Sequence, residues 1–264
     1  MATSPAPTLT VVEGESYTPP KMDFKGAWQA LKALMADKED TTQVFKIMGC
    51  LTGKSLWKKY QQFAKTEVGN RVLTENIDLL DTLADRDALA RLPEGSLGRV
   101  YLDFMKRENI TAEGLAEASD GRYEQLTHAG LKRYAIRSRD MHDLWHVVSG
   151  FGRDGLGEIC VVAFSYPQSG SHGFGAIALM GLVNLAREYP KRGVWKAVWQ
   201  AYRMGKKAAW LPGQDWEHLL TLPYADVRAH LKLSDPTYYA ALTDIIAETR
   251  PEAIAAKNEA LQAA

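Results

Sequence analysis

The chain has 264 residues, of which 46% are hydrophobic, and its 32 basic residues balance 32 acidic ones, so the formal net charge is zero. A chain without a basic excess has no overall field that attracts nucleic acid, and we expect no nucleic-acid partner. The two cysteines form no CxxC pair, which excludes a disulfide framework and is typical of a protein in a reducing compartment.

Residues 1–21 are predicted to form a disordered N-terminal arm, because they hold four prolines and no apolar run of signal-peptide length. No lysine or arginine precedes residue 21, so an Arg-rich transit peptide is not expected either, and the composition favours a bacterial-type protein. The longest uncharged apolar stretch, residues 173–186, has 14 residues. It is shorter than the roughly 18 residues that a membrane span requires.

Residues 22–264 are predicted to form one all-α, multi-helix domain, because apolar residues recur every three or four positions from Phe24 to Met35 and in most later stretches. Few stretches alternate with a period of two, and no Asn-Gly or Asp-Gly hairpin separates such stretches. Caps are predicted at Asp40 or Thr41, Ser55, Thr74 and Ser96. The predicted helices are, in chain order, 24–35, 41–48, 55–63, 74–85, 96–108, a short one from 111, 123–136, 139–150, 157–165, 172–189, 193–211, 224–233 and 236–262.

Two histidines, His142 and His146, lie one turn apart in the predicted helix 139–150, with Asp143 between them. Because successive residues advance by about 100° around a helix, the three side chains project from one face. Imidazole and carboxylate groups gathered in this way bind zinc, manganese or ferrous iron. Glu158 adds a further donor across a glycine-rich turn, so the sequence predicts a metal site between two consecutive helices.

A salt bridge is the alternative explanation for Glu158. This residue is followed by the apolar run 159–164, and an uncompensated carboxylate in such surroundings is costly. Arg137, Arg139 or Arg153 would neutralise it without a metal. The sequence leaves both explanations open.

The glycine-rich turn at residues 150–155 reads GFGRDG and matches the letters of GxGxxG. The dinucleotide fingerprint requires a strand before it, whereas here a predicted helix with two histidines precedes it. We therefore expect no nucleotide site. The glycines are predicted to end one helix and to form a tight turn that brings Glu158 back towards His146. They are Gly150, Gly152, Gly155 and Gly157.

The predicted helix 172–189 is apolar on nearly every side and rich in small residues. Small residues permit close packing as a central core helix, or they leave a groove for an apolar chain. For the second case the predicted lipid-binding residues are Gly173, Gly175, Met180 and Gly181.

Basic residues dominate between Arg187 and Lys207, and Trp195, Trp199 and Tyr202 share one helical face there. Basic residues beside an aromatic stripe suit the surface of an anionic membrane, although a solvated face with a packed aromatic edge fits the same pattern. The predicted membrane-facing residues are Trp195, Lys196, Trp199 and Arg203.

The HDxxH motif of His142, Asp143 and His146, followed by eleven residues and Glu158, resembles the signature of the ubiquinone biosynthesis protein 4 family. Flanking segments are similar to that family as well, over most of residues 24–235. They are 92–105, the pair Arg137 and Arg139, and 215–233. One position departs from the pattern, because Ser138 stands where an aromatic residue is expected between the two arginines.

The resemblance implies a helical homodimer that lies peripherally on the membrane where ubiquinone is made, the cytoplasmic face in a bacterial-type protein. It implies a divalent metal, usually described as zinc, with iron, manganese or cobalt as alternatives. It further implies a polyprenylated benzoquinone-type lipid bound between helices, and other ubiquinone biosynthesis proteins as partners.

Two functions compete under this resemblance. One is an enzyme for the oxidative decarboxylation that replaces the C1 carboxylate of a prenylated 4-hydroxybenzoate by a hydroxyl; the other is a non-catalytic, lipid-binding organiser of the biosynthetic complex. For the enzyme, we expect Asp143 to bind metal, orient a ligand or act as a base, and Arg137 or Arg139 to pair with the substrate carboxylate. A metallohydrolase is a third possibility, because HDxxH is similar to the HExxH of zinc peptidases.

Overall fold

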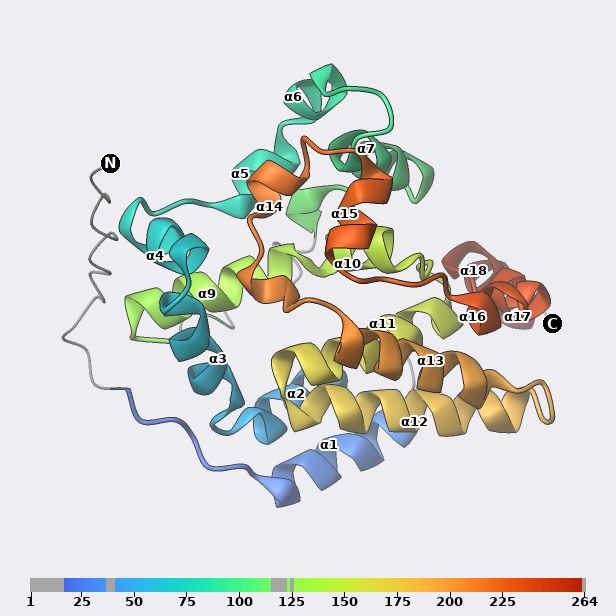
Figure 1. Cartoon of the computed structure of the whole chain (residues 1–264). Helices are drawn as coiled ribbons and strands as arrows, with labels where there is room; N and C mark the ends of the chain where they lie inside the picture. The colour runs from blue at the N-terminus through green and yellow to red at the C-terminus, as the bar shows by residue number, and fades with distance from the viewer. Residues whose placement is uncertain (1–16, 37–40, 115–122, 124–125, 263–264) are drawn as a thin grey trace, which may run out of the picture.

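The computed structural model describes residues 17–36, 41–114, 123 and 126–262. Within these residues every regular element is a helix, and one isolated antiparallel bridge joins Ser96 to Pro223. The all-α prediction is therefore confirmed. The helices follow one another as α1 (Phe24–Ala36), α2 (Thr41–Thr52), α3 (Ser55–Ala64), α4 (Glu67–Thr74), α5 (Leu79–Ala84), α6 (Arg86–Arg91), α7 (Leu97–Arg107), α9 (Ala129–Asp140), α10 (His142–Ser149), α11 (Gly155–Ser169), α12 (His172–Glu188), α13 (Val194–Lys207), the 3-10 turn η1 (Leu211–Gly213), α14 (Trp216–Leu219), α15 (Tyr224–His230), α16 (Thr237–Ala240), α17 (Thr243–Glu248) and α18 (Pro251–Gln262) (Figure 1).

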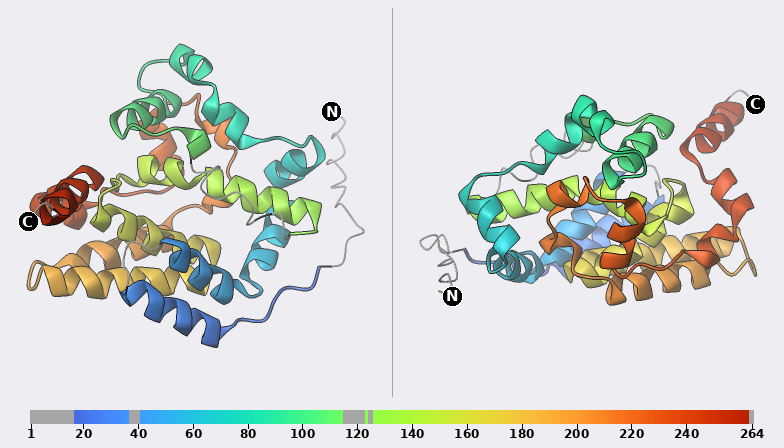
Figure 2. Two further views of the ribbon diagram at one scale, coloured as in Figure 1. Left: turned by 180° about the vertical axis from the view of Figure 1, so that it is seen from behind. Right: turned by 45° about the horizontal axis from the view of Figure 1, so that its top comes forward.

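The helices form two halves with α9 and α10 running between them (Figure 1). One half contains α11, α12 and α13, with α1 and α2 packed against α12; the other contains α5, α6 and α7 together with α14 and α15 (Figures 1 and 2). The candidate metal residues of α10 and α11 therefore lie at the junction of the two halves.

Helix α11 is the centre of the largest core cluster. Its residues Cys160, Val161 and Phe164 are fully buried against α12 and α13. A Cβ atom added to Gly205 of α13 would lie 2.1 Å from the carbonyl oxygen of Phe164. Only glycine allows the two backbones to approach so closely, and this contact fixes the helix that carries Glu158.

Two smaller clusters complete the core. Tyr60, Phe63, Val72, Leu131 and Tyr134 join α3, α4 and α9, and a second group joins α1 and α2 to α12. Of the predicted arm, residues 1–16 lie outside the described residues. Tyr17 is described, and its ring packs 5.2 Å from the ring of Trp57.

The single helix predicted at 236–262 is wrong, because this stretch forms the three helices α16, α17 and α18. Proline has no N–H to donate, so it interrupts a helix but fits the first position of a new one. Pro251 accordingly begins α18, after α17 ends at Glu248.

The helix predicted at 123–136 begins later, at Ala129, because His128 caps it. The Nδ1 atom of His128 accepts a hydrogen bond of 3.1 Å from the backbone N–H of Leu131. Residues 112–114 are helical, where a short helix is predicted from residue 111, and the rest of that prediction lies outside the described residues.

Of the predicted caps, Ser96 is confirmed, since its hydroxyl accepts the N–H of Arg99 at the start of α7. Ser55 is the first residue of α3 rather than its cap, and Asp78, not Thr74, caps α5. Asp40 lies outside the described residues, and α2 begins at Thr41.

Candidate metal centre

The loop between α10 and α11 turns the chain back on itself, as the glycines predicted. Helix α10 ends at Ser149, and its C-cap Gly150 has a φ of +78°, a left-handed conformation that favours glycine. Asp154 caps α11, where its Oδ1 atom accepts the N–H of Gly157 at 3.0 Å. Gly157 also touches the turn, since an added Cβ would lie 2.1 Å from the carbonyl oxygen of Gly152. Glu158 therefore sits in the first turn of α11, facing α10.

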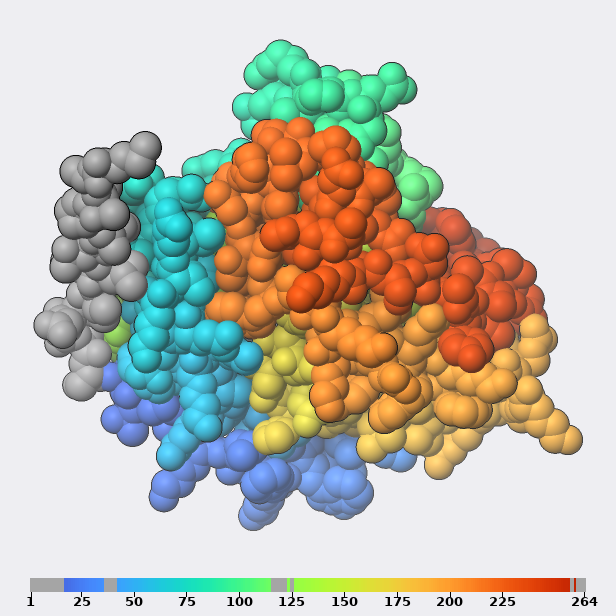
Figure 3. Space-filling model, viewed as in Figure 1, coloured from blue at the N-terminus to red at the C-terminus, as the bar shows by residue number. Residues whose placement is uncertain are grey.

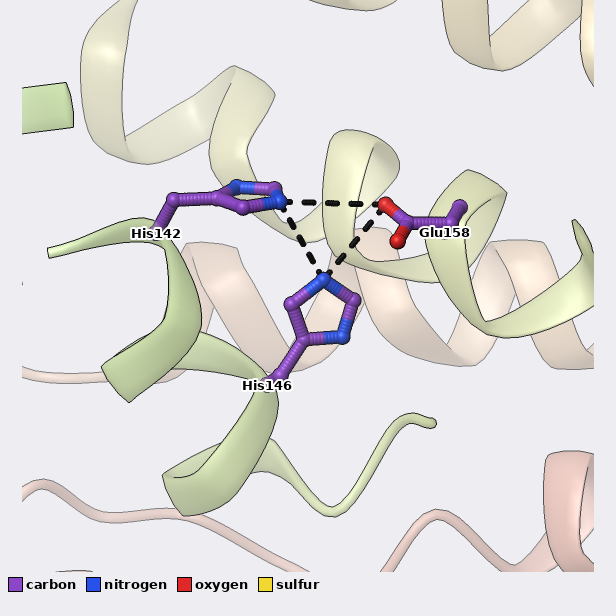
Figure 4. Close-up of side chains that lie close together, drawn as sticks. All are labelled: His142, His146 and Glu158. Atoms are coloured by element: carbon purple, nitrogen blue, oxygen red, sulfur yellow. Dashed lines mark hydrogen bonds and ion pairs between the residues drawn. The ribbon is translucent and has the colours of Figure 1, made fainter. Parts of the chain in front are cut away.

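His142, His146 and Glu158 converge on one point (Figure 4). The two Nε2 atoms lie 3.2 Å apart, and the Glu158 Oε2 atom lies 3.4 Å from Nε2 of His146 and 3.7 Å from Nε2 of His142. Donors about 2.0–2.2 Å from a tetrahedral zinc ion are roughly 3.3 Å from one another. The three residues thus fit a divalent cation in both chemistry and spacing.

The other ring nitrogen of His146 is held by the loop. Its Nδ1 atom lies 3.1 Å from the carbonyl oxygen of Phe151. A carbonyl oxygen only accepts, so Nδ1 carries the hydrogen and donates it, which leaves Nε2 to face the cluster. With an exposed fraction of 1%, His146 has no room to turn.

The charges in the cluster are strongly coupled. Burial disfavours the charged forms, but hydrogen bonds and opposite charges outweigh it: Glu158 raises the pKa of His146, and the two histidines hold the pKa of Glu158 well below its usual range. Two imidazole nitrogens and a carboxylate at these distances require a positive charge among them, which either a proton or a metal ion supplies.

Asp143 lies outside the trio of converging donor atoms. It is buried in the first turn of α10, and its negative charge contributes to the raised pKa of His146. Burial first, and then the charge of Asp143, also raise the pKa of Tyr101, a buried residue of α7 that the sequence did not single out. The placement of Asp143 fits a role beside the cluster better than a fourth position within it.

Arg137 and Arg139 already have carboxylate partners. Arg137 is buried and forms two hydrogen bonds, of 2.6 and 2.7 Å, with the carboxylate of Glu217. Arg139 pairs with Asp140 at 2.7 Å. In the described part of the chain, the arginine found within 4.0 Å of Glu158 is Arg153, at 3.9 Å. That distance is long for a salt bridge that neutralises Glu158. Without a metal, the charge of Glu158 would therefore have to be balanced by the two histidines.

A cavity of about 900 Å³ lies between α1, α2, α11 and α12 and is lined mostly by apolar side chains. Met180 and Gly181, two of the predicted lipid-binding residues, line it, as does Ile159, the neighbour of Glu158. Gly173 and Gly175 instead serve close packing. Cβ atoms added there would lie 2.8 Å from Cα of Met48 and 3.2 Å from the ring of Tyr166.

Helices α13 and α1 each expose two large aromatic side chains to solvent. On α13 these are Trp195 and Trp199, with 56% and 54% of their surface exposed, and Lys196 lies 5.9 Å above the ring of Trp195; the predicted Arg203 of the same helix is exposed as well. On α1, Phe24 and Trp28 are exposed, which the sequence did not indicate. Figure 3 shows α1 along the lower surface of the molecule. No helix among the described residues has both the length and the apolar character needed to cross a bilayer.

Known proteins are similar to this chain over most of its length. A family model described as "Coenzyme Q (ubiquinone) biosynthesis protein Coq4" matches residues 25–237. A protein of Anopheles gambiae named "Ubiquinone biosynthesis protein COQ4 homolog, mitochondrial" is 27% identical over 187 residues, which are 70% of this chain and 64% of that protein. The protein of the same name from Bos taurus is 26% identical over 191 residues, 72% of this chain and 70% of its own length. The match thus spans just under two thirds of the Anopheles protein.

The fold has a solved counterpart. The crystal structure of a protein from Nostoc punctiforme PCC 73102, provisionally named a ubiquinone biosynthesis protein, superposes on this chain with a TM-score of 0.58. The two sequences are 22% identical, and the match covers 80% of this chain and 98% of that one. At this level of identity the likeness shows that the two chains share a fold.

Proposed function

Because the chain belongs to the coenzyme Q (ubiquinone) biosynthesis protein Coq4 family, we propose that it works in ubiquinone biosynthesis as a metal-dependent enzyme for the C1 oxidative decarboxylation of a prenylated 4-hydroxybenzoate. The observation that carries this proposal is the convergence of His142, His146 and Glu158 within 4.8 Å.

The three converging residues would hold the ion. Zinc fits the donors, and iron, manganese or cobalt are the alternatives. A divalent ion held there supplies Lewis acidity towards a phenolate or carboxylate oxygen of the substrate. Glu158 and the two histidines would set its position, and α11, whose Cys160, Val161 and Phe164 are buried in the core, keeps Glu158 in place.

With dioxygen as the oxidant, the reaction balances without a further reductant. The bond between C1 and the carboxylate breaks and releases carbon dioxide, one oxygen atom becomes bonded to C1, and the other leaves as water. The ring departs as the quinone, and the C1 hydroxyl forms only when a two-electron donor reduces that quinone in a separate step. We assign Asp143 to accept the phenol proton, because its carboxylate is buried beside the cluster. Arg137 and Arg139 are less suited to bind the substrate carboxylate, since each would have to give up its present partner.

The apolar cavity suits the prenyl tail of this substrate. Its volume of about 900 Å³ is in the range of ligand sites, and its wall contains Ile159, the residue next to Glu158 on α11. A tail lying along Met180 and Gly181 would therefore begin near the cluster. The exposed tryptophans and basic residues of α13 would hold the protein on the membrane surface from which such a lipid comes. Homodimer formation and association with other ubiquinone biosynthesis proteins belong to the same proposal.

The test is to replace Glu158 in a strain that lacks the wild-type gene. With Glu158→Gln, mass spectrometry should detect a prenylated ring intermediate that keeps its carboxylate, and ubiquinone should fall. Glu94→Gln, at an exposed residue in the loop before α7, is the matched control and should restore normal ubiquinone. Normal ubiquinone in the Glu158→Gln strain would refute the enzymatic function.

The second candidate, an organiser of the biosynthetic complex, is favoured by the exposed aromatic faces of α1 and α13. It predicts a different outcome in the same strain. The other ubiquinone biosynthesis proteins should dissociate, and intermediates of several steps should accumulate. Retention of the complex together with one carboxylated intermediate supports the enzyme instead.

A further inference from the structure

The segment after residue 237 reaches back to the loop between the two helices that carry the cluster. Figure 1 shows α16 and α17 beside the ends of α10 and α11. Tyr239 of α16 is buried, with 6% of its surface exposed. Its hydroxyl donates a hydrogen bond to Oδ2 of Asp154 and accepts one of 2.9 Å from the N–H of Gly152.

Each partner of this hydroxyl acts on one side of the cluster. Asp154 is the cap of α11, four residues before Glu158. Gly152 follows Phe151, whose carbonyl oxygen accepts from Nδ1 of His146. The ring of Tyr239 also packs edge-on against the ring of Phe151, at 5.4 Å and 82°. One side chain therefore contacts both the cap of the Glu158 helix and the loop that orients His146.

A second contact from the same segment supports the first. The backbone N–H of Gly155 donates to the carbonyl oxygen of Thr249 at 2.9 Å. Glycine leaves room for both contacts. A Cβ atom added to Gly152 would lie 2.7 Å from the Tyr239 hydroxyl, and one added to Gly155 would lie 3.2 Å from Cβ of Thr249. Loop and segment thus fit one another by close approach.

We propose that Tyr239 is a positioning residue for the metal centre, which it holds in register through Asp154 and Gly152 without touching the donors. This proposal rests on the proposed function, because it concerns the same three donors. Tyr239 lies beyond residue 237, where the family match ends.

The test uses the full chain with Tyr239→Phe, which removes the hydroxyl and keeps the ring against Phe151. Affinity for Zn²⁺, measured by competition, should fall about tenfold, the lower end of what loss of a group that orients a ligand costs. With Co²⁺ as the probe, the visible absorption of the site should change in band position or intensity. Tyr238→Phe, at the neighbouring exposed tyrosine, should leave both readouts unchanged.

General loss of stability is controlled by Phe63→Leu. Phe63 is fully buried in the separate cluster of α3, α4 and α9, so this variant lowers the melting temperature without touching the loop. If Phe63→Leu weakens Zn²⁺ binding as much as Tyr239→Phe does, or if Tyr239→Phe leaves affinity and spectrum unchanged, the positioning role is refuted.

A readout without metal separates this inference from the proposed function. If the wild-type chain binds neither ion, the metal-dependent function fails, and nuclear magnetic resonance of the His146 ring decides the positioning role. The Nδ1–H of His146 should give a protected signal in the wild type and in Tyr238→Phe, and that signal should be lost or shifted in Tyr239→Phe. An unchanged signal in Tyr239→Phe overturns the inference.

Discussion

At the scale of single residues, His146 shows how the site is ordered. One of its ring nitrogens donates to the carbonyl oxygen of Phe151 and the other faces Glu158 and His142. The spacing of the two histidines made this pair visible in the sequence, because residues four apart share a helix face. The hydrogen-bond partner of Nδ1 could not be predicted, because it is a backbone carbonyl, a group that every residue has.

One substitution of Asp143 distinguishes a proton acceptor from a metal ligand. If it accepts a proton beside the cluster, Asp143→Asn should keep the bound metal and abolish turnover, because the amide is nearly the same size but does not take up a proton. If it is a ligand, the same change should lower the metal content. Metal analysis of the purified variant, with His172→Asn at an exposed histidine of α12 as control, separates the two.

At the scale of helices, sequence patterns located most elements because their causes are local. The apolar period marks α1, the aromatic stripe marks α13, the continuous apolar stretch marks α12, and the glycines mark the end of α10. The Arg137–Glu217 pair and the Tyr239–Asp154 contact were not predictable, since the partners are 80 and 85 positions apart. Likewise, Pro251 was the one local signal that separates α16, α17 and α18 from a single long helix. Whether a proline begins a new helix or kinks an existing one depends on packing, so this signal did not decide the prediction.

Helix packing also separates two glycines that look alike in the sequence. Gly205→Ala should destabilise the protein by about 1–3 kcal/mol, because the new Cβ meets the backbone of Phe164 at 2.1 Å and forces α11 and α13 apart. Gly49 of α2 has no atom within 4 Å of an added Cβ. Gly49→Ala should therefore stabilise by about 0.5–1 kcal/mol through helix propensity.

Chemical denaturation of both variants measures these changes. Equal stability of the two alanine variants would mean that the close contact between α11 and α13 does not constrain the fold.

At the scale of the whole molecule, the cavity and the exposed faces arise only from assembly. The sequence drew attention to α12 alone, but the cavity wall also includes Leu31 and Leu34 of α1 and Ile159 of α11. Helices distant in the chain supply these residues, so their convergence could not be predicted from periodicity. The same holds for α1, whose exposed Phe24 and Trp28 follow from how it packs on α2.

The proposed function requires one property of the folded chain, that His142, His146 and Glu158 together hold one divalent ion. The direct measurement is the metal content of the purified protein by mass spectrometry, with titration by Zn²⁺ after chelation. We expect about one ion per chain in the wild type and in Glu94→Gln, and loss of this stoichiometric binding in Glu158→Gln and in His146→Gln. A wild-type chain that stays folded and binds no ion, or a Glu158→Gln variant that binds it with unchanged affinity, would contradict a metal centre at these three residues.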